Sequence, residues 1–248
     1  MTEQPAVTEQ SNISKQVVNV GRDLRAEQRE AAERFRRRMR RQGTYVVRLL
    51  SSPGSGKTTL LEVTAQRLGE RYSVGVLVGD VETDRDATRL APYAATAQIT
   101  TGGACHLELP LVERRLPDLG SATLDFLFLE DIGNLICPAS HDLGEHVRVV
   151  VLSTTEGDDK PGKYPKAFRS SDVLVISKLD LLPHVPFSVE RAVEDASLVH
   201  EGMTTLPLSA LTGEGIDAWC DFLVEQRERV TTGVDAREAF GPDDGPCT

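Results

Sequence analysis

The amino-acid sequence predicts an α/β fold, with a mostly parallel central sheet and helices on both of its faces. Short runs of Val, Leu and Ile alternate along the chain with stretches that carry apolar residues at helical spacing. Strands that are apolar throughout are typical of parallel sheets covered on both sides. Several polar motifs follow directly after these runs, where ligands bind in open parallel sheets. The sequence therefore places a ligand site at one edge of the sheet.

The expected elements follow one another in a regular order. Strands are predicted at residues 45–50, 74–78, 97–100, 124–129, 147–152, 172–177 and 205–208. Helices are predicted at residues 22–42, 58–68, 84–94, 107–116, 188–199 and 214–230. Polar residues without a sustained period predict a flexible tail over 1–20, followed by a basic helix over 21–42 that ends at Gly43. One domain is expected over 43–230, with a second flexible tail over 231–248.

Composition limits the class of protein. The 248 residues are 40% hydrophobic but only 5% aromatic, so the core must be mainly aliphatic. No apolar run approaches the ~20 residues of a membrane-spanning helix, and the N-terminus lacks the features of a secretory signal. A cytoplasmic location is therefore expected. The four cysteines form no CxxC pair, and cytosolic cysteines serve metal binding or catalysis more than cross-linking.

Charge is unevenly distributed along the chain. The net charge is -10, yet residues 22–41 hold nine arginines against four acidic residues. An acidic body is a poor binder of nucleic acid, so no nucleic-acid partner is expected. An arginine helix that binds nucleic acid with strong salt dependence is the alternative. Otherwise the basic helix either docks a protein partner or is a solvated helix.

The strongest motif is the glycine-rich segment SSPGSGKT at residues 51–58, between a predicted strand and a predicted helix. This is a P-loop, whose glycines let backbone amides wrap around phosphates at a helix N-terminus. Lys57 is expected to reach the β- and γ-phosphates, and the Thr58 hydroxyl to bind Mg²⁺. Ser51 stands where the usual pattern has glycine. The predicted phosphate-binding residues are Gly54, Ser55, Gly56, Lys57, Thr58 and Thr59.

Carboxylates at two strand ends are further ligands for Mg²⁺, which prefers hard oxygen atoms. Asp80 and Glu130 each follow an apolar run, and either binds the ion directly or through water. Asp84 and Asp86 either close on the γ-phosphate or cap the next helix. No residue stands out as a general base, so slow hydrolysis is expected. The predicted catalytic residues are Lys57, Thr58 and Asp80.

A second motif, SKLD at residues 177–180, resembles the guanine-reading pattern Asn-Lys-x-Asp. The Asp180 carboxylate can accept hydrogen bonds from N1–H and the N2 amino group of guanine, and adenine offers neither donor there. The Lys178 stem is expected on the face of the base. Ser177 replaces the usual Asn, so one supporting contact is expected to be weakened or lost. The predicted base-binding residues are Lys178, Asp180, Ser209 and Ala210, the last two through amides that face guanine O6.

A candidate soft-metal site consists of Cys105, His106 and Cys137. Thiolate and imidazole together suit Ni²⁺, Zn²⁺ or copper rather than Mg²⁺. Three ligands are few for a closed site, and a two-fold dimer would complete the set. Buried cysteines without a ligand role are the alternative. No ligand role is expected for the remaining candidates, with His141 and His146 at the surface, Cys220 in the core and Cys247 in the tail.

The motifs taken together resemble those of one family, the HypB hydrogenase nickel-incorporation GTPases. The matching segments come in the family's order and span about residues 45–220. They are SSPGSGKTTLLE (51–62), GDVETDRDA (79–87), TTGGACHLE (100–108), GNLICPASHDLGE (133–145), TEGDDKPGKYPKAF (155–168) and SKLDLL (177–182). The resemblance implies a P-loop GTPase domain over 43–230 that works with GTP, GDP and Mg²⁺.

The resemblance also implies a metal cargo and partners. It implies that Cys105, His106 and Cys137 bind nickel or zinc in a homodimer that forms with GTP. It further implies a small zinc-containing metallochaperone partner of the HypA type, docked by the N-terminal segment, and nickel delivery to the large subunit of [NiFe]-hydrogenase. The first 100 residues contain no Cys or His. The N-terminal cysteine motif and the histidine-rich nickel store of some members are therefore not expected.

Nucleotide and metal are expected to act on each other, because both soft-ligand loops lie next to phosphate-binding elements. Lys160 and Lys163 are candidates for contacts that hold the dimer. Two rival classes fit part of the pattern. The urease nickel GTPase has a contiguous Cys-Pro-His, whereas these residues are separate here. A small-molecule P-loop kinase would need neither Asp180 nor the Cys-His loop.

Overall fold

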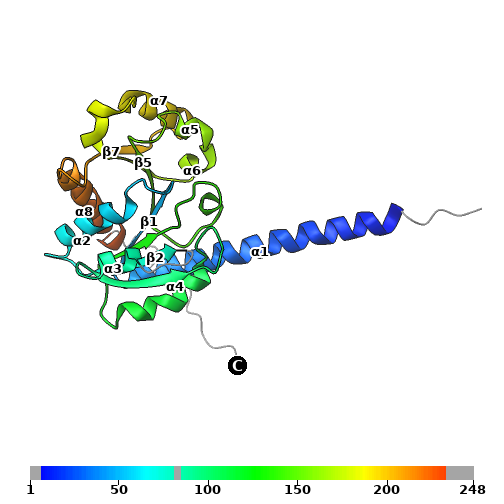
Figure 1. Ribbon diagram of the computed structural model, residues 1–248. Helices are drawn as coiled ribbons and strands as arrows, with labels where there is room; N and C mark the ends of the chain where they lie inside the picture. Colours follow the sequence, from blue (N-terminus) through cyan, green and yellow to red (C-terminus); the bar gives the residue numbers. More distant parts are fainter. Residues whose placement is uncertain (1–6, 81–84, 233–248) are drawn as a thin grey trace, which may run out of the picture.

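The central feature of the protein is a seven-stranded parallel sheet (Figure 1). The computed structural model describes the backbone of residues 7–80 and 85–232, and the side-chain surroundings from residue 24 onward within those ranges. The strands lie in the order β3-β2-β4-β1-β5-β6-β7, and every neighbouring pair is parallel. They are β1 (Tyr45–Ser51), β2 (Val74–Asp80), β3 (Ala95–Thr100), β4 (Phe126–Glu130), β5 (Val147–Ser153), β6 (Val173–Ser177) and β7 (Thr204–Pro207). The predicted α/β fold with a parallel sheet is confirmed.

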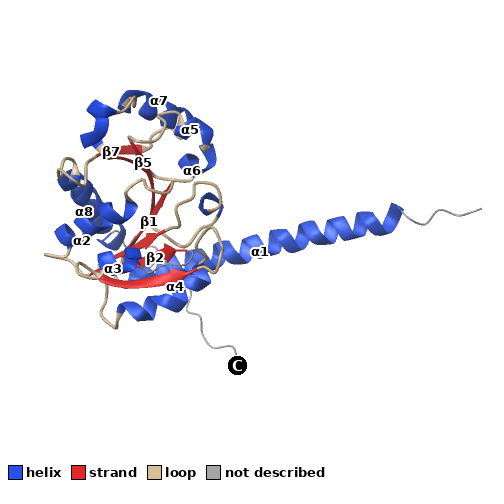
Figure 2. Ribbon diagram, in the orientation of Figure 1, coloured by secondary structure: helices blue, strands red, loops and turns tan. Residues whose placement is uncertain are grey.

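Helices cover both faces of this sheet (Figure 2). On one face α2, α3 and α8 pack against the apolar side chains of β1, β2 and β4. On the other face α1 and α4 cover one half of the sheet, and α6 and α7 cover the half formed by β5 and β6. The helices are α1 (Val7–Arg41), α2 (Lys57–Leu68), α3 (Arg85–Leu90), α4 (Leu109–Arg115), α5 (Lys160–Lys163), α6 (Pro165–Arg169), α7 (Val189–Val199) and α8 (Ile216–Thr232).

The register of the sheet brings its polar strand ends to one edge. Glu130 pairs with both Leu49 of β1 and Val78 of β2, and Ser177 pairs with Ser153 of β5. Because all strands are parallel, their carboxyl ends meet at the same edge. The ends of strands that are far apart in the sequence therefore become neighbours there.

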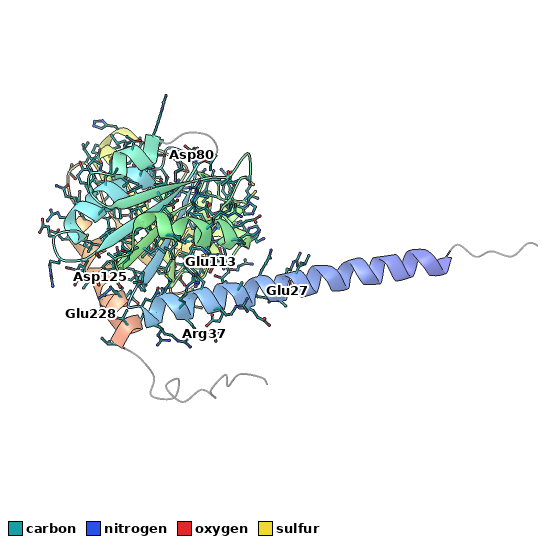
Figure 3. All side chains as sticks on the ribbon, turned by 90° about the horizontal axis from the view of Figure 1, so that it is seen from below. Glu27, Arg37, Asp80, Glu113, Asp125 and Glu228 are labelled. Atoms are coloured by element: carbon teal, nitrogen blue, oxygen red, sulfur yellow. The ribbon has the colours of Figure 1, made fainter. Side chains whose placement is uncertain are left out.

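Helix α1 is longer than the sequence predicts. It begins at Val7, so residues 7–20, expected as part of a flexible tail, continue the basic helix. No proline lies between residues 6 and 41, and adding a residue to an existing helix costs much less than starting one. The C-terminal half docks through three buried side chains, whereas the rest projects from the body, with Glu27 on that projection (Figure 3). The docking side chains are Ala32, Phe35 and Met39.

Arginines near the end of α1 bind the body instead of facing only solvent. Arg36 forms an ion pair with Asp142 at 2.8 Å, and Arg38 forms one with Glu113 at 2.9 Å. Arg36 also donates to the Glu145 carbonyl at 2.8 Å. Part of the arginine-rich segment is thus a docking surface for the chain's own domain.

Several short elements differ from the expected pattern. Two single-turn helices, α5 and α6, and the 3₁₀ turns Pro138–Ser140 and Leu179–His184 were not anticipated. Pro161 and Pro165 lie in the first turns of α5 and α6, where a missing N–H costs nothing. The helix expected at 84–94 is shortened to α3, and the one expected at 107–116 to α4 and a 3₁₀ turn.

Both expected tails lie partly outside the described residues. Residues 1–6 of the first tail are not described. Residues 231–232 complete α8, and the remainder of the second expected tail, 233–248, is not described. Among the described helices, none has the length and apolar character needed to cross a membrane.

Gly144 packs against α1 so closely that the contact predicts the effect of a substitution on stability. Its φ is +77°, and a Cβ there would lie 2.6 Å from the Ala32 carbonyl oxygen and 2.8 Å from the Phe35 ring. Gly43 has a similar φ of +75° but nothing within 4 Å. Gly43→Ala should cost ~1–2 kcal/mol for the left-handed backbone alone. Gly144→Ala should cost at least ~1 kcal/mol more, because a packed backbone must shift.

Urea unfolding of both variants measures this difference directly. Equal losses of unfolding free energy in Gly144→Ala and Gly43→Ala would mean that α1 is not seated on the body as described.

Candidate functional site

The phosphate loop connects β1 to α2, as the sequence predicts. Gly54 and Gly56 take left-handed φ values of 72° and 94°, which only glycine adopts without strain. Lys57 is buried, and its ammonium donates to Ser51 Oγ at 2.6 Å. Burial lowers the pKa of Lys57. The serine in place of glycine therefore gives the P-loop lysine a hydroxyl partner.

A carboxylate from β4 meets this loop. The Thr58 hydroxyl donates to Glu130 Oε1 at 2.7 Å. The other oxygen, Glu130 Oε2, is buried and has no hydrogen-bond partner among the described residues. Burial raises the pKa of Glu130 to about 7. An orphaned, buried carboxylate oxygen beside a threonine hydroxyl fits a hard cation such as Mg²⁺.

These groups open into one cavity of about 610 Å³. Asp80, at the end of β2, lines it together with Asp86 in the first turn of α3. Asp84 lies outside the described residues. Arg89 also lines the cavity, although no motif in the sequence points to it, and it forms an ion pair with Glu62 at 2.7 Å. The remaining lining residues are Pro53, Gly54, Ser55, Gly56, Lys57, Thr58, Thr59, Gly79, Glu130, Asp131, Ile132, Gly133 and Lys178.

The SKLD segment lies against the phosphate loop. The buried Ser177 hydroxyl donates to the Ser55 carbonyl at 2.7 Å. The serine at this position therefore still makes one contact that ties the end of β6 to the P-loop, whereas the expected effect of replacing Asn stays a prediction. Lys178 has a left-handed φ of 62°, and its ammonium donates to the Gly54 carbonyl at 2.7 Å. A non-glycine residue in this strained conformation is typical of functional sites.

The acidic residue of the segment is held by the last predicted loop. The hydroxyl of the fully buried Ser209 donates to Asp180 Oδ1. Ser209 directly follows the buried Leu208, and Ala210 is half-buried next to it. The four predicted base-binding residues thus lie on two loops joined by this hydrogen bond.

The three predicted soft ligands come together from two loops. Cys105 and His106 follow β3, and Cys137 follows β4. A hydrogen bond with the Cys137 thiol raises the pKa of Cys105. Cys105 Sγ lies 3.8 Å from His106 Nδ1. Within the described part of this single chain, no three His, Cys, Asp or Glu side chains are arranged to hold a metal ion.

His141 belongs to this cluster. The prediction that it lies at the surface without a contact to the soft ligands is wrong. Its ring stacks on His106, with 3.9 Å between ring centroids and 17° between planes. Its Nδ1 lies 3.1 Å from the Cys137 carbonyl oxygen. The burial of His106 lowers the pKa of that imidazole, and His106 Nε2 has no hydrogen-bond partner among the described residues. The four-residue spacing between Cys137 and His141 was the available signal.

His146 was also expected at the surface, and this too is wrong. Its ring stacks on Tyr45 with 5.4 Å between centroids, and its Nδ1 accepts from the Val46 amide at 2.9 Å. Burial lowers the pKa of His146 to about 4, so its role is in packing. Cys220 lies in the core as expected, and Cys247 lies outside the described residues.

The two lysines proposed for dimer contacts have partners within the chain. Lys160 Nζ donates to Ser52 Oγ at 3.0 Å and lies 3.0 Å from Glu156 Oε2. The exposed Lys163 pairs with Asp159 at the surface. Lys160 therefore lies directly beside the phosphate loop, whereas Lys163 is the more available of the two for an external contact.

The parallel sheet, the loop between β1 and α2, and the carboxylate at the end of β4 define a P-loop nucleotide-binding protein. The family model of the CobW/HypB/UreG nucleotide-binding domain matches residues 45–207. The hydrogenase maturation factor HypB of Rhizobium leguminosarum is 43% identical over 208 residues, which cover 84% of this chain and 70% of that one. HypB of Escherichia coli is 41% identical over 86% of this chain and 74% of its own length.

Solved structures agree with this relationship. A crystal structure of HypB from Archaeoglobus fulgidus matches with a TM-score of 0.75 and 38% identity, over 82% of this chain and 99% of that one. HypB from Helicobacter pylori in complex with nickel matches with a TM-score of 0.75 and 34% identity, over 88% and 99%. The chain belongs to the HypB family of hydrogenase maturation factors, within the CobW/HypB/UreG group of P-loop nucleotide hydrolases.

Glu130 predicts a specific pH dependence of stability without nucleotide. Its pKa is about 7 in the folded chain against 4.5 ordinarily. The folded state therefore holds the proton more tightly, and this contribution is fully present below about pH 4.5 and is lost as pH rises through 7. Glu130→Gln should remove that loss, on the order of 1–3 kcal/mol.

The measurement is the unfolding free energy of wild type and Glu130→Gln from pH 5 to 8. The difference between the two proteins isolates Glu130 from other titrating groups, such as His146. Parallel pH profiles for the two proteins would contradict the assignment.

Proposed function

We propose that this protein is a GTP-hydrolysing metal carrier that binds nickel or zinc and delivers nickel during the maturation of [NiFe]-hydrogenase. The observation that carries the proposal is the position of the soft ligands. Cys105 and His106 follow the strand next to β2, and Cys137 follows β4, which ends in Glu130 at the nucleotide cavity. The nickel complex of the related Helicobacter pylori protein supports nickel as the cargo.

Guanine is the proposed base because the Asp180 carboxylate offers an acceptor for its N–H donors. Asp180 accepts from Ser209 through Oδ1, and a carboxylate has further lone pairs for the N1–H and N2–H donors of guanine. Adenine would leave this acceptor unpaired. Ser177 and Lys178 support the site by their hydrogen bonds to the P-loop carbonyls.

Magnesium fits the set Thr58, Glu130 and Asp80 at the phosphate end of the cavity. When bound, the ion would neutralise phosphate charge. Lys57 would leave Ser51 for the β- and γ-phosphates, and Thr58 would turn its hydroxyl oxygen to the cation. None of the described side chains is placed as an evident general base for the water that attacks GTP. Slow GTP hydrolysis is therefore proposed.

A second copy of the chain is proposed to complete the metal site. The donors of one chain are close together but are not arranged as a closed set. A two-fold dimer that forms with GTP would bring two such sets together. A small zinc-containing HypA-type metallochaperone and, indirectly, the hydrogenase large subunit are the proposed partners. Reduced thiols at the site fit a cytoplasmic location.

Guanine recognition is tested at Asp180. Asp180→Ala should weaken GDP binding ~10–100-fold, because two hydrogen bonds to a charged acceptor are lost. ADP binding should stay equally weak in both proteins. Titration calorimetry measures both affinities, with the exposed Asp217 changed to Ala as the matched control. A GDP affinity that Asp180→Ala leaves unchanged would remove guanine selectivity from this residue.

Nickel binding is tested by titration read through thiolate-to-metal absorbance. Wild type should bind nickel with an affinity that differs between the GDP state and the GTP-analogue state. Cys105→Ser should lose the band, whereas Cys247→Ser should keep it. The absence of any Cys105-dependent band in both nucleotide states would overturn the proposed metal role and leave a P-loop nucleotide hydrolase.

A further inference from the structure

A buried arginine lies in the middle of the central strand. Arg48 in β1 is 0% exposed, and its register partners are Leu129 of β4 and Arg148 of β5. It lies on the face of the sheet that α1, α4, α6 and α7 cover. Helices α1 and α4 cover one half of this face, and α6 and α7 cover the other half. Burying a guanidinium is costly, and well-packed apolar residues often replace buried ion pairs without loss of stability. A buried arginine at this place therefore needs an explanation other than stability.

The partners of Arg48 belong to the loop after β4 that carries Cys137. Its guanidinium forms an ion pair with the fully buried Asp131, with Nε to Oδ2 at 2.9 Å. It also donates to the Pro138 carbonyl at 3.3 Å and to the His141 carbonyl. Pro138 begins the turn Pro138–Ser140 that follows Cys137, and His141 comes directly after this turn. Arg48 thus holds the Cys137 turn from inside the protein.

Asp131 extends the same contact to the other loop. Its Oδ1 accepts from the Leu107 amide at 3.2 Å and from its neighbour Ile132 at 2.9 Å. Leu107 directly follows Cys105 and His106. One buried ion pair therefore joins both loops, although their ligands are about thirty residues apart in sequence.

A second ion pair, between Glu145 and Arg148, completes the network, and the carboxylate of Glu145 stays ionised in it. Glu145 lies 3.5 Å from Arg48 and accepts from Arg148 Nε at 2.6 Å. Although burial would raise the pKa of Glu145, Arg48 and Arg148 lower it to about 2. Arg148 also donates to the His141 carbonyl at 2.9 Å. Two arginines and two carboxylates thus satisfy each other around the end of the Cys137 turn.

The network begins one residue after Glu130, which lines the proposed nucleotide cavity. Glu130 and Asp131 are adjacent, and successive side chains of an extended chain point to opposite faces. Glu130 receives the Thr58 hydrogen bond on the P-loop face, whereas Asp131 meets Arg48 on the other face. Farther along, a Cβ on Gly133 would lie 3.0 Å from Pro53 Cα in the phosphate loop. The segment 130–133 therefore contacts the phosphate loop at both of its ends.

We propose that Arg48 and Asp131 are positioning residues that hold the Cys105–His106 loop and the Cys137 turn together and pass a shift of Glu130 at the nucleotide to both loops. The inference rests on the proposed function, in which Thr58 leaves Glu130 for Mg²⁺. Because Asp131 follows Glu130 directly, a new position of the strand end moves the carboxylate that anchors both loops. Differential contact with the two nucleotide states is what such coupling requires.

The test uses the full-length protein with Cys247 changed to Ser, and Arg48→Lys as the main variant. Lysine keeps the charge but lacks the fork that reaches Asp131 and two carbonyls together. Asp131→Asn is the second variant, for use if a melting curve shows that the Arg48→Lys protein does not fold. The matched control is Arg227→Lys. Arg227 pairs with Asp125 just before β4, at the opposite edge of the sheet from Asp80 (Figure 3).

Two readouts are taken with GDP and with a non-hydrolysable GTP analogue. The first is the reaction rate of Cys105 and Cys137 with a thiol–disulfide reagent, which needs no metal. The second is Ni²⁺ affinity. In the Cys247→Ser parent both should depend on nucleotide. In Arg48→Lys the thiols should react faster, Ni²⁺ affinity should fall roughly 10-fold or more, and the ratio between nucleotide states should approach one for both readouts. Arg227→Lys should behave like its parent.

Each outcome decides between the two proposals. A parent-like nucleotide dependence of both readouts in Arg48→Lys and Asp131→Asn would overturn the positioning role. Equal effects of Arg48→Lys and Arg227→Lys would also overturn it, because they would reflect general loosening. Absent nickel binding in the parent, together with thiol rates that still separate Arg48→Lys from Arg227→Lys, would overturn the proposed metal function and leave the positioning role standing.

Discussion

The parallel pairing of β4 with β1 and β2 is the constraint on which the rest of the structure depends. It sets Glu130 beside Leu49 and Val78, so that the carboxylate meets Thr58 of the phosphate loop. It also fixes where the chain leaves the sheet after Glu130, and thereby where Asp131 and Cys137 lie. A parallel sheet must cross over after every strand. The nucleotide end and the soft-ligand loops are therefore built at the same edge.

Buried polar side chains give this edge its properties. Lys57, Thr58 and Glu130 are all buried, and they satisfy one another only partly, since Glu130 Oε2 has no partner among the described residues. Such a group is costly unless a ligand or proton meets it. In contrast, Arg48, Asp131 and Glu145 satisfy each other. The P-loop end thus leaves one buried carboxylate oxygen without a partner among the described residues, which supports the proposed cation there, whereas the charged side chains behind the thiols are paired.

Much of the fold and part of the candidate site could be predicted from the sequence. Apolar runs identified β1, β2, β4, β5 and β6, because strands buried on both faces need continuous aliphatic residues. The edge strands β3 and β7 were predicted as well, although ATAQIT and TTLP are not apolar runs. The P-loop, Glu130 and the SKLD segment are local motifs at strand ends. His141 and His146 were wrongly predicted at the surface. Both lie in the irregular segment between β4 and β5, where no helical or strand periodicity of apolar residues indicates which side chains are buried. Arg48 interrupts an apolar run, and only the three-dimensional contacts with Asp131 and His141 show what it does. The start of α1 at Val7 likewise depends on helix propagation from a docked segment.

The central claim is that nucleotide and metal share one coupled structure around the end of β4. Coupling between two ligands is reciprocal, so any change in Ni²⁺ affinity caused by nucleotide must appear as an equal change in nucleotide affinity caused by Ni²⁺. The most direct measurement is therefore the affinity for GDP and for a non-hydrolysable GTP analogue, each with and without saturating Ni²⁺. The account predicts that Ni²⁺ changes the ratio of the two nucleotide affinities by about 5-fold or more. An unchanged ratio at saturating Ni²⁺ would contradict it.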